Sequence, residues 1–405
     1  MWLPRRLRPP PAEPAPEALR VVVELRQFDR GGLERVVLDI SRGLDRARIA
    51  PLIVSLGPLG ALAAEARAHG LRVERLPARN PHEAYARLLD EFRPALAVTH
   101  FSTLGLDLFA ARGIPAIAVI HNVYAFMDEA QRRRFAADDA RIAHYIAVSR
   151  NAARYAGERL GIAPARITTI PNGLDLAAYQ RRAAAARPAP RPPGIAPGDY
   201  VFLNVAAYNL HKGHHLMAAA MRLLLAQRQD IRIVCVGNTV NPEHLRTLRA
   251  RLKAEGLDRH MLLPGYADRV EKMFAMADAF LLPSFIEGWS IAMNEAMAFA
   301  RPLILTDTGA AAEVIENEDI GILVPNEYGD TTALDQPLLD RLACDTREFR
   351  TAPVLAAAMA RFADARAHWQ AAGARGRDKL RARLDLRETV RQHEAVMRRI
   401  AQARA

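Results

Sequence analysis

The sequence predicts two α/β domains that face a cleft, each built on a doubly wound parallel sheet. Three observations carry this prediction. The chain has 405 residues, 50% of them hydrophobic, which is too many for one ordinary core. Short apolar runs alternate with amphipathic stretches, the pattern of βαβ units. A stretch rich in Pro, Ala and Arg, residues 181–199, interrupts the alternation and is expected to be a linker.

The first Rossmann-like domain is expected at residues 19–180. Residues 1–18 hold five prolines between Pro9 and Pro16. We therefore expect them to be disordered or extended, and to lack the apolar core of a signal peptide. Apolar runs bounded by turn residues predict the strands of this domain: Leu19–Leu25, Pro51–Leu56, Leu71–Leu76, Ala95–Thr99, Ala116–Ile120, Tyr145–Val148 and Ile167–Ile170.

The second Rossmann-like domain is expected at residues 200–384, where the same alternation resumes. A basic helix at residues 385–405 should follow and pack back on the first domain. Residues 328–351 show no regular pattern and are expected to be irregular. The expected strands are Val201–Val205, Ile231–Val236, Met261–Leu263, Ala279–Leu282, Leu303–Thr306 and Gly321–Val324.

The charge of the chain, +11 at pH 7, is concentrated at its end. Residues 345–405 hold 14 Arg and Lys against seven Asp and Glu. This excess indicates either a solvated helical face or attraction to an anionic membrane surface or a phosphorylated acceptor. No basic motif interleaved with aromatic residues accompanies it, so a nucleic-acid partner is not expected.

Cysteine usage and hydropathy indicate the compartment. Cys235 lies in an apolar run and should be buried, while Cys344 has no Cys or His partner at metal-binding spacing. A reducing compartment follows. No apolar run reaches the roughly 18 residues of a membrane span. We therefore expect a protein of the cytoplasm, or one bound at the inner face of the cytoplasmic membrane.

Ligands of doubly wound sheets bind beyond the carboxyl ends of the strands, and the segment Leu281–Ala300 provides suitable chemistry there. Glu287 lies in the loop after a strand, and Glu295 lies one turn into the next helix. Gly288, Trp289, Ser290 and Ile291 connect the loop to the helix. The N-terminus of a helix can hold a diphosphate, and a carboxylate can accept the hydroxyls of a sugar or ribose.

The spacing Glu287-x7-Glu295 resembles the signature of family 4 of the retaining glycosyltransferases, the group 1 enzymes with the GT-B fold. The resemblance implies that Glu287 contacts the donor sugar and Glu295 the nucleotide ribose. The surrounding sequence is also similar to this family: Ala277-Asp278-Ala279, Leu282-Pro283-Ser284, Arg301-Pro302-Leu303-Ile304, Thr308-Gly309 and Glu313-Val314-Ile315.

Two further loops of the second domain resemble the family. Lys212, followed by Gly213, is placed to meet a β-phosphate. The family commonly carries an Arg five residues before this Lys, where this chain has Ala207. Either another Arg substitutes, or diphosphate binding depends on Lys212 and the helix N-terminus. Gly265 begins a loop similar to the one that holds the nucleotide base.

The first domain contributes Gly31, Gly32 and His121 to the expected site. Gly31 and Gly32 follow the first strand and resemble the family's first loop, whose backbone can lie against phosphate or acceptor. His121 ends a strand at the cleft, where the family commonly carries a His close to the reaction centre. His100 ends the neighbouring strand and is a weaker candidate. Ser149 is expected to cap a helix.

The resemblance implies transfer of a sugar from a nucleoside-diphosphate donor, UDP- or GDP-linked, with retention at the anomeric carbon. The enzyme would be a hexosyltransferase of cell-surface polysaccharide or lipopolysaccharide biosynthesis, acting on a glycan or lipid-linked glycan. No Asp-x-Asp motif lies near the site, so neither a metal nor another cofactor is expected. Two alternatives stay open: a nucleotide-sugar epimerase on the same fold, and a catalytically impaired homologue that binds nucleotide-sugar, which Ala207 favours.

Overall fold

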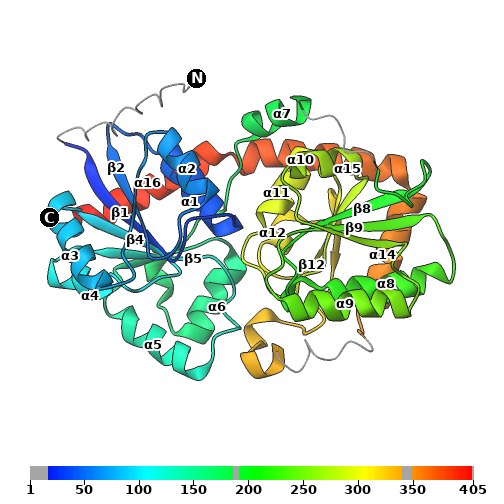
Figure 1. The fold of residues 1–405 in the computed structure, drawn as a ribbon, viewed down its shortest axis with the longest axis horizontal. Coiled ribbons are helices and arrows are strands. Elements are labelled where there is room, and N and C mark those ends of the chain that lie inside the picture. The colour runs from blue at the N-terminus through cyan, green and yellow to red at the C-terminus, as the bar shows by residue number, and fades with distance from the viewer. Residues whose placement is uncertain (1–16, 186–190, 340–348, 404–405) are drawn as a thin grey trace, which may run out of the picture.

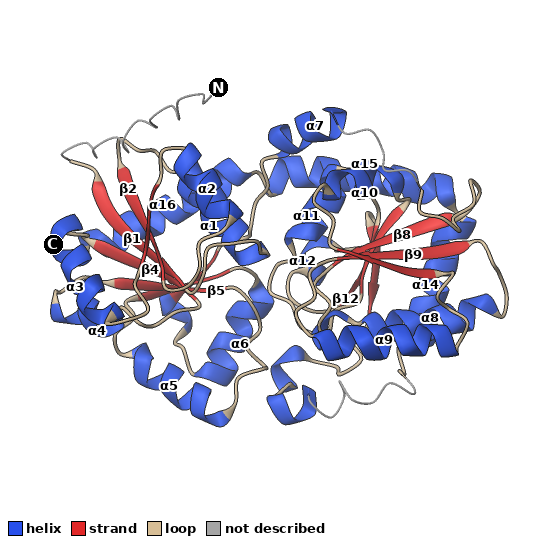
Figure 2. Ribbon diagram, in the orientation of Figure 1, coloured by secondary structure: helices blue, strands red, loops and turns tan. Residues whose placement is uncertain are grey.

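The computed structural model describes residues 17–185, 191–339 and 349–403. The predictions for residues 1–16 and for Cys344 lie outside the described residues. Each half of the described chain forms one parallel sheet, and Figure 2 shows helices on both faces of each. No helix in these three ranges is long and apolar enough to cross a membrane.

The first sheet has the strand order β3-β2-β1-β4-β5-β6-β7 in the described residues, and all its pairs are parallel. Its central strands are buried on both faces, which explains why they are continuous apolar runs. The strands are β1 (Leu19–Leu25), β2 (Ile49–Ser55), β3 (Arg72–Arg75), β4 (Leu96–His100), β5 (Ala116–Ile120), β6 (His144–Ala147) and β7 (Ile167–Thr169). The helices are α1 (Gly32–Gly43), α2 (Ala61–Ala68), α3 (Pro81–Phe92), α4 (Leu106–Ala111), α5 (Glu129–Asp139) and α6 (Arg150–Leu160).

The second sheet has the order β10-β9-β8-β11-β12-β13 and is also parallel throughout its described strands. Its strands are β8 (Tyr200–Val205), β9 (Ile231–Val236), β10 (Met261–Gly265), β11 (Ala279–Leu282), β12 (Leu303–Thr306) and β13 (Gly321–Val324). Its helices are α8 (His214–Leu225), α9 (Pro242–Ala254), α10 (Val270–Met276), α11 (Ile291–Ala298), α12 (Ala311–Val314), α14 (Ala352–Asp364) and α15 (Arg366–Arg383). The architecture of two facing Rossmann-like domains is therefore confirmed.

Three sequence-based expectations differ from the structure. The segment expected to be irregular from residue 181 begins as helix, because α7 (Leu176–Ala185) continues into its alanines. Gly265 does not start a loop but ends β10, after a register shift that follows Leu262. Residues 331–333 form a 3-10 turn within the stretch expected to be irregular.

The C-terminal helix α16 (Leu386–Gln402) returns from the second domain to the first, as Figure 1 shows in red. It packs along α1, and its side chains Val390, Val396 and Met397 are buried. Leu174 donates to the carbonyl of Leu384 at 2.9 Å and accepts from the N–H of Leu386 at 3.2 Å. This crossing fastens the chain end to the first domain.

Part of the basic excess of the chain end is neutralised within the fold. Glu316 accepts from Lys379 and from Arg383, at 3.1 and 2.9 Å. Arg387 pairs with Asp385 at 2.7 Å, and Arg391 pairs with Glu388 at 2.5 Å. These ion pairs favour the solvated helical face over a free cationic surface.

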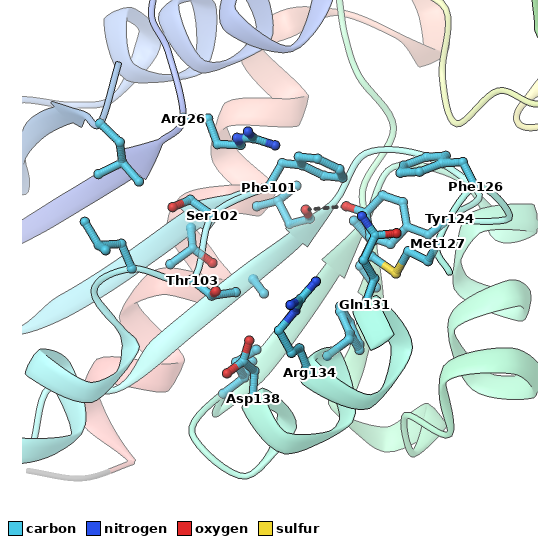
Figure 3. A pocket seen from close by; sticks show the side chains of 18 residues that line it. Arg26, Phe101, Ser102, Thr103, Tyr124, Phe126, Met127, Gln131, Arg134 and Asp138 are labelled. Carbon is cyan, nitrogen blue, oxygen red and sulfur yellow. Dashed lines mark hydrogen bonds between the residues drawn. The ribbon is translucent and has the colours of Figure 1, made fainter. Parts of the chain in front are cut away.

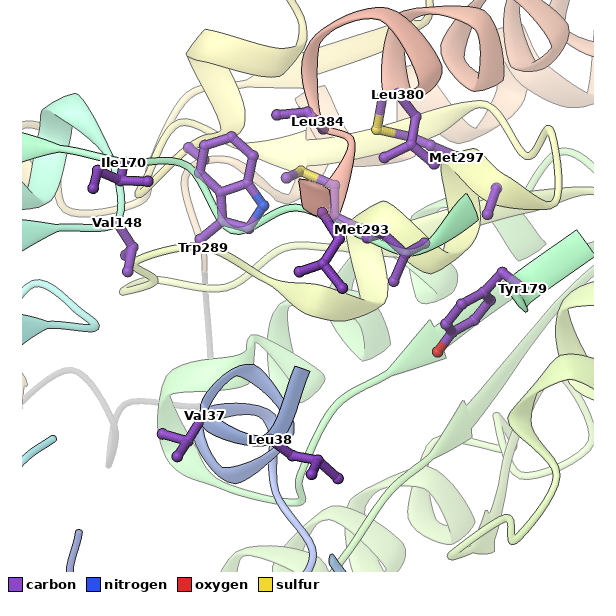
Figure 4. Packing of buried hydrophobic residues seen from close by; sticks show 14 of the residues in the cluster. Val37, Leu38, Val148, Ile170, Tyr179, Trp289, Met293, Met297, Leu380 and Leu384 are labelled. Atoms are coloured by element: carbon purple, nitrogen blue, oxygen red, sulfur yellow. The ribbon is translucent and has the colours of Figure 1, made fainter. Parts of the chain in front are cut away.

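One hydrophobic cluster runs through the junction of the two domains. Figure 4 shows Val148 and Ile170 of the first domain beside Trp289 and Met293 of the second. Because apolar contacts cross the junction here, the two domains are held together at the base of the cleft.

Candidate active site

A cavity of about 670 Å³ lies between the two domains. The first domain lines it with the start of α1 and the end of β5. The second domain lines it with the loops after β8 and β9 and the loop before α11. All these segments follow the carboxyl ends of parallel strands, which is where doubly wound sheets bind ligands. The expected site residues at the wall are Gly31, Gly32, His121, Lys212, Glu287, Trp289, Ser290, Ile291 and Glu295.

Lys212 and Glu287 form an ion pair inside this cavity. The Lys212 ammonium lies 2.5 Å from the Glu287 carboxylate, and their side chains are 22% and 13% exposed. Ser284 donates to the same carboxylate at 3.0 Å. Glu287 is therefore held in a fixed orientation, and a cation stands directly beside the group expected to face a sugar.

The N-terminus of α11 points its free N–H groups at the cavity. Ser290 occupies the N-cap position and makes no side-chain cap bond, so the first turn keeps its donors for a ligand. Trp289 is buried, and its indole N–H donates to Asn294 at 3.1 Å. Asn294 in turn donates to the carbonyl of Asn172 in the first domain at 2.7 Å. Trp289 thus touches the cavity but also anchors the domain junction.

Glu295 lies on the first full turn of α11 and accepts a hydrogen bond from the Tyr179 hydroxyl of α7. Burial raises the pKa of Glu295 to about 8, against a smaller lowering by Arg35. Glu295 is therefore protonated at neutral pH in the protein without ligand. Ribose hydroxyls that replaced Tyr179 would meet a carboxyl group whose charge depends on the pH.

His121 is backed by two further histidines. Its Nε2 atom lies 2.8 Å from Nδ1 of His100 at the end of β4. Burial lowers the pKa of His121 to about 3 and that of His393, on α16, to about 4. Burial also lowers the pKa of His100 well below its usual range. These lowered pKa values favour neutral rings at physiological pH, and the hydrogen bond between the ring nitrogens of His100 and His121 orients the His121 ring. His100, expected as the weaker candidate, meets His121 because β4 pairs with β5, and this contact has no local signal in the sequence.

Gly288 lies at the closest approach of the two domains. A Cβ atom at Gly288 would stand 2.0 Å from the carbonyl oxygen of His121. Only a glycine permits this contact. The two domains therefore touch each other at Gly288 and His121, and we call this contact the closed arrangement.

The start of α6 also joins the domains. Asn151 accepts from the N–H of Gly309 at 3.1 Å and donates to Thr331 at 2.8 Å. The N–H of Arg150 donates to Glu313 at 2.6 Å. Ser149 caps this helix by accepting from the N–H of Ala152 at 3.1 Å, as expected. Arg150 and Asn151 therefore join the start of α6 to the second domain, while Ser149 caps the helix.

The cavity wall also includes residues that the sequence did not suggest, among them Arg30, Asn238 and Tyr266. Each of these three is next to a glycine at or after the end of a strand. That position was the signal available in the sequence. Arg30 lies over the Tyr266 ring at 5.1 Å and pairs with Asp268 at 3.5 Å, which closes the mouth of the cavity across the domains. Tyr266 lines the wall, whereas the neighbouring Gly265, expected at the site, is not among the residues that line it.

Family models match both halves of the chain. Residues 30–178 match the model described as "Glycosyltransferase Family 4". Residues 187–349 match the model described as "Glycosyl transferases group 1". The chain belongs to the family 4 glycosyltransferases, which have the GT-B fold.

Individual relatives and a solved structure agree with this assignment. The chain is 28% identical to a D-inositol 3-phosphate glycosyltransferase of Jonesia denitrificans over 42% of each chain. It is 25% identical to an Escherichia coli UDP-Gal:alpha-D-GlcNAc-diphosphoundecaprenol alpha-1,3-galactosyltransferase over 59% of this chain and 64% of the relative. Each match spans less than two thirds of the relative. The crystal structure of Anabaena Alr3699/HepE in complex with UDP superposes with a TM-score of 0.74 at 16% identity, over 93% of this chain and 98% of that one.

Proposed function

We propose that this protein transfers a sugar from a nucleoside-diphosphate donor to an acceptor glycan or lipid-linked glycan, with retention of the anomeric configuration. One observation carries the proposal. Lys212, Glu287 and the N-terminus of α11 converge in one cavity, and His121 approaches them from the opposite domain. Preorganised positive charge of this kind stabilises a leaving diphosphate.

The geometry supports a division of work among these groups. Lys212 and the first turn of α11 would neutralise the diphosphate as the bond to the sugar breaks. Glu287 would hold the sugar hydroxyls, and Glu295 would hold the ribose. No carboxylate acts as a nucleophile in this proposal. The departing phosphate oxygen takes the acceptor proton on the same face of the sugar, which gives retention, and no metal or other cofactor takes part.

The donor and the setting are also proposed. The UDP named in the structural neighbour and in the E. coli relative favours a UDP-sugar over a GDP-sugar. The lipid diphosphate in the name of that relative favours a lipid-linked acceptor. We place the reaction in cell-surface polysaccharide or lipopolysaccharide biosynthesis, in the cytoplasm or at the inner face of the cytoplasmic membrane, with no nucleic-acid partner.

The test is binding and slow hydrolysis of UDP-, GDP- and ADP-sugars, measured with the wild type, Lys212→Ala and Glu295→Ala. We expect one nucleotide class to bind, and each variant to weaken binding about tenfold or more. Lys253→Ala, at an exposed residue of α9, is the control and should bind like the wild type. Full activity in the presence of EDTA is expected.

Other results would identify the alternatives. Nucleotide binding without hydrolysis or transfer would favour the impaired homologue, with Ala207 as its mark. An epimerised nucleotide-sugar formed without an acceptor would identify an epimerase. Binding of none of the nucleotides would overturn the proposal.

A further inference from the structure

A second pocket, of about 450 Å³, lies in the first domain beside the donor cavity. It opens between α5 and the carboxyl ends of β4 and β5 (Figure 3). Phe101, Tyr124 and Phe126 line both this pocket and the donor cavity. A ligand in the pocket therefore has a direct path to the reaction centre.

One face of α5 covers this pocket, and Phe135 on that face also packs on the hydrophobic core. Gln131, Arg134, Phe135 and Asp138 follow the i, i+3, i+4, i+7 spacing of a single helical face, and all four line the pocket. A helix that covers a sheet normally carries apolar residues at such positions. Here three of the four are polar, and no residue of α5 is buried. This face is built to meet a ligand that has polar groups.

The opposite wall is aromatic and apolar. The Phe101 and Tyr124 rings lie 5.5 Å apart, Tyr124 and Phe126 lie 5.7 Å apart, and Tyr124 and Phe135 lie 6.4 Å apart. Phe101 is 38% exposed, which is unusual for so large an apolar side chain. The other apolar lining residues are Leu56, Leu104, Ala118, Val119, Ile120, Met127 and Ile142.

The charge of the pocket comes from two arginines. Arg26 follows β1 and Arg134 lies on α5, and Figure 3 shows them on either side of the pocket. Both are exposed, and neither has an ion-pair partner among the described residues. The one carboxylate of the lining, Asp138, pairs with Arg141 at 2.6 Å. The pocket therefore offers two available guanidinium groups above an apolar wall.

We propose that this pocket binds the acceptor, and that the acceptor carries a phosphate group directly beside an apolar moiety. Arg26 and Arg134 bind the phosphate, since the planar guanidinium fits phosphate oxygens in two parallel hydrogen bonds. The aromatic wall takes the apolar part, and the group to be glycosylated extends past Tyr124 towards His121. This inference rests on the proposed function, because it specifies the acceptor of the same reaction.

Geranyl phosphate is a suitable probe because it joins a phosphate to a short apolar chain. Its binding to the full chain is measured by isothermal titration in the presence of saturating UDP, which occupies the donor cavity. Geraniol tests the apolar part alone, and inorganic phosphate tests the charge alone. We expect geraniol and inorganic phosphate each to bind at least about tenfold more weakly than geranyl phosphate.

Substitutions locate the probe. Arg134→Gln and Arg26→Gln should each weaken geranyl phosphate about tenfold. Arg133→Gln removes an arginine of the same helix that pairs with Glu129 at 3.6 Å and does not line the pocket, so it should change nothing. Equal binding of geraniol and geranyl phosphate would overturn the proposal. The proposal would also be overturned if Arg133→Gln weakened geranyl phosphate binding as much as Arg134→Gln, or if geranyl phosphate did not bind at millimolar concentration.

The proposed function fails separately from this inference. Its test is binding and hydrolysis of nucleotide-sugars, which Arg133→Gln, at a residue that lines neither cavity, should leave unchanged. If no nucleotide binds, while Arg134→Gln still weakens geranyl phosphate binding and Arg133→Gln does not, the pocket proposal stands and the transferase proposal falls. If nucleotide-sugar is hydrolysed but Arg134→Gln and Arg133→Gln bind geranyl phosphate equally well, the transferase proposal stands and the pocket proposal falls.

Discussion

The two walls of the cleft are built in different ways. The wall of the second domain comes largely from one segment of sequence, which holds Glu287 in a loop and Glu295 in the helix that follows. Lys212, the other main group, lies in a single loop after β8. The wall of the first domain comes from the ends of β1, β4 and β5 and from α5, and its functional groups are scattered along more than a hundred residues.

Under the proposed function, the difference follows from what each wall would bind. A diphosphate and a ribose make the same demands in any such donor, so one loop and one helix N-terminus can meet them with a compact pattern. An acceptor is recognised by shape and by dispersed polar groups, which any strand end can supply. The sequence is therefore informative about the donor wall and nearly silent about the acceptor wall.

The largest effect is expected where the donor wall loses its central carboxylate. Glu287→Ala should lower turnover about 10²–10³-fold, because it removes the group proposed to face the sugar and leaves Lys212 without its partner. Turnover at saturating donor is the measurement. Glu318→Ala removes a surface carboxylate that pairs with Arg361 at 3.0 Å and should keep full activity. Turnover of Glu287→Ala within threefold of the wild type would remove the donor wall from the mechanism.

The second prediction separates the two walls. Gly288→Ala places a Cβ atom against the His121 carbonyl, so the domains can no longer close fully. A misplacement of about 1 Å costs about 10²-fold in turnover, while nucleotide binding to the second domain should stay within a few-fold of the wild type. Small-angle scattering should show a larger radius of gyration. Gly198→Ala, where a Cβ atom meets nothing within 4 Å, is the control. A normal turnover in Gly288→Ala would show that closure at this contact is not needed.

The same contrast explains what the sequence could predict of the fold. Strands that are buried on both faces are apolar runs bounded by turn residues, so β1, β5, β9, β11, β12 and β13 have the predicted boundaries. The end of α7 was missed because the prolines after it suggested a linker, while its alanines favour helix.

The site shows the same division. Groups within one loop–helix unit were predicted by position, whereas contacts between distant segments were not. Tyr179 and Glu295 are 116 residues apart, and His100 meets His121 only because their strands pair. The pocket under α5 has no sequence signal, since a helical face of Gln, Arg, Phe and Asp resembles any solvent-exposed face.

The third prediction concerns the junction between the walls. Asn294→Leu leaves two buried groups unsatisfied, the Trp289 N–H and the Asn172 carbonyl. Each costs about 1–3 kcal/mol, so the free energy of unfolding should fall by roughly 2–6 kcal/mol in denaturant titration. Gln229→Leu removes an exposed amide that donates to the Leu225 carbonyl at 2.9 Å, and it should change stability by less than about 0.5 kcal/mol. Equal effects of the two substitutions would mean that the junction does not depend on Asn294.

The smallest effect tests the charge state of the donor wall. The folded pKa of Glu295, about 8, lies above its ordinary value of 4.5. Between these pH values the folded state keeps a proton that the unfolded state releases, so this group's contribution to stability falls as the pH rises from about 5 to 8. Glu295→Gln cannot ionise and should lose this dependence.

The measurement is the difference in melting temperature between Glu295→Gln and the wild type, without nucleotide, at several pH values. The difference should move in favour of Glu295→Gln between pH 5 and 8, by the equivalent of up to about 4 kcal/mol, which is the full effect of the pKa shift over these three pH units. Glu318→Gln, at the surface pair with Arg361, should show a constant difference from the wild type. A constant difference for Glu295→Gln as well would mean that Glu295 is charged before the donor arrives, and the donor wall would then be fully ionised in the free protein.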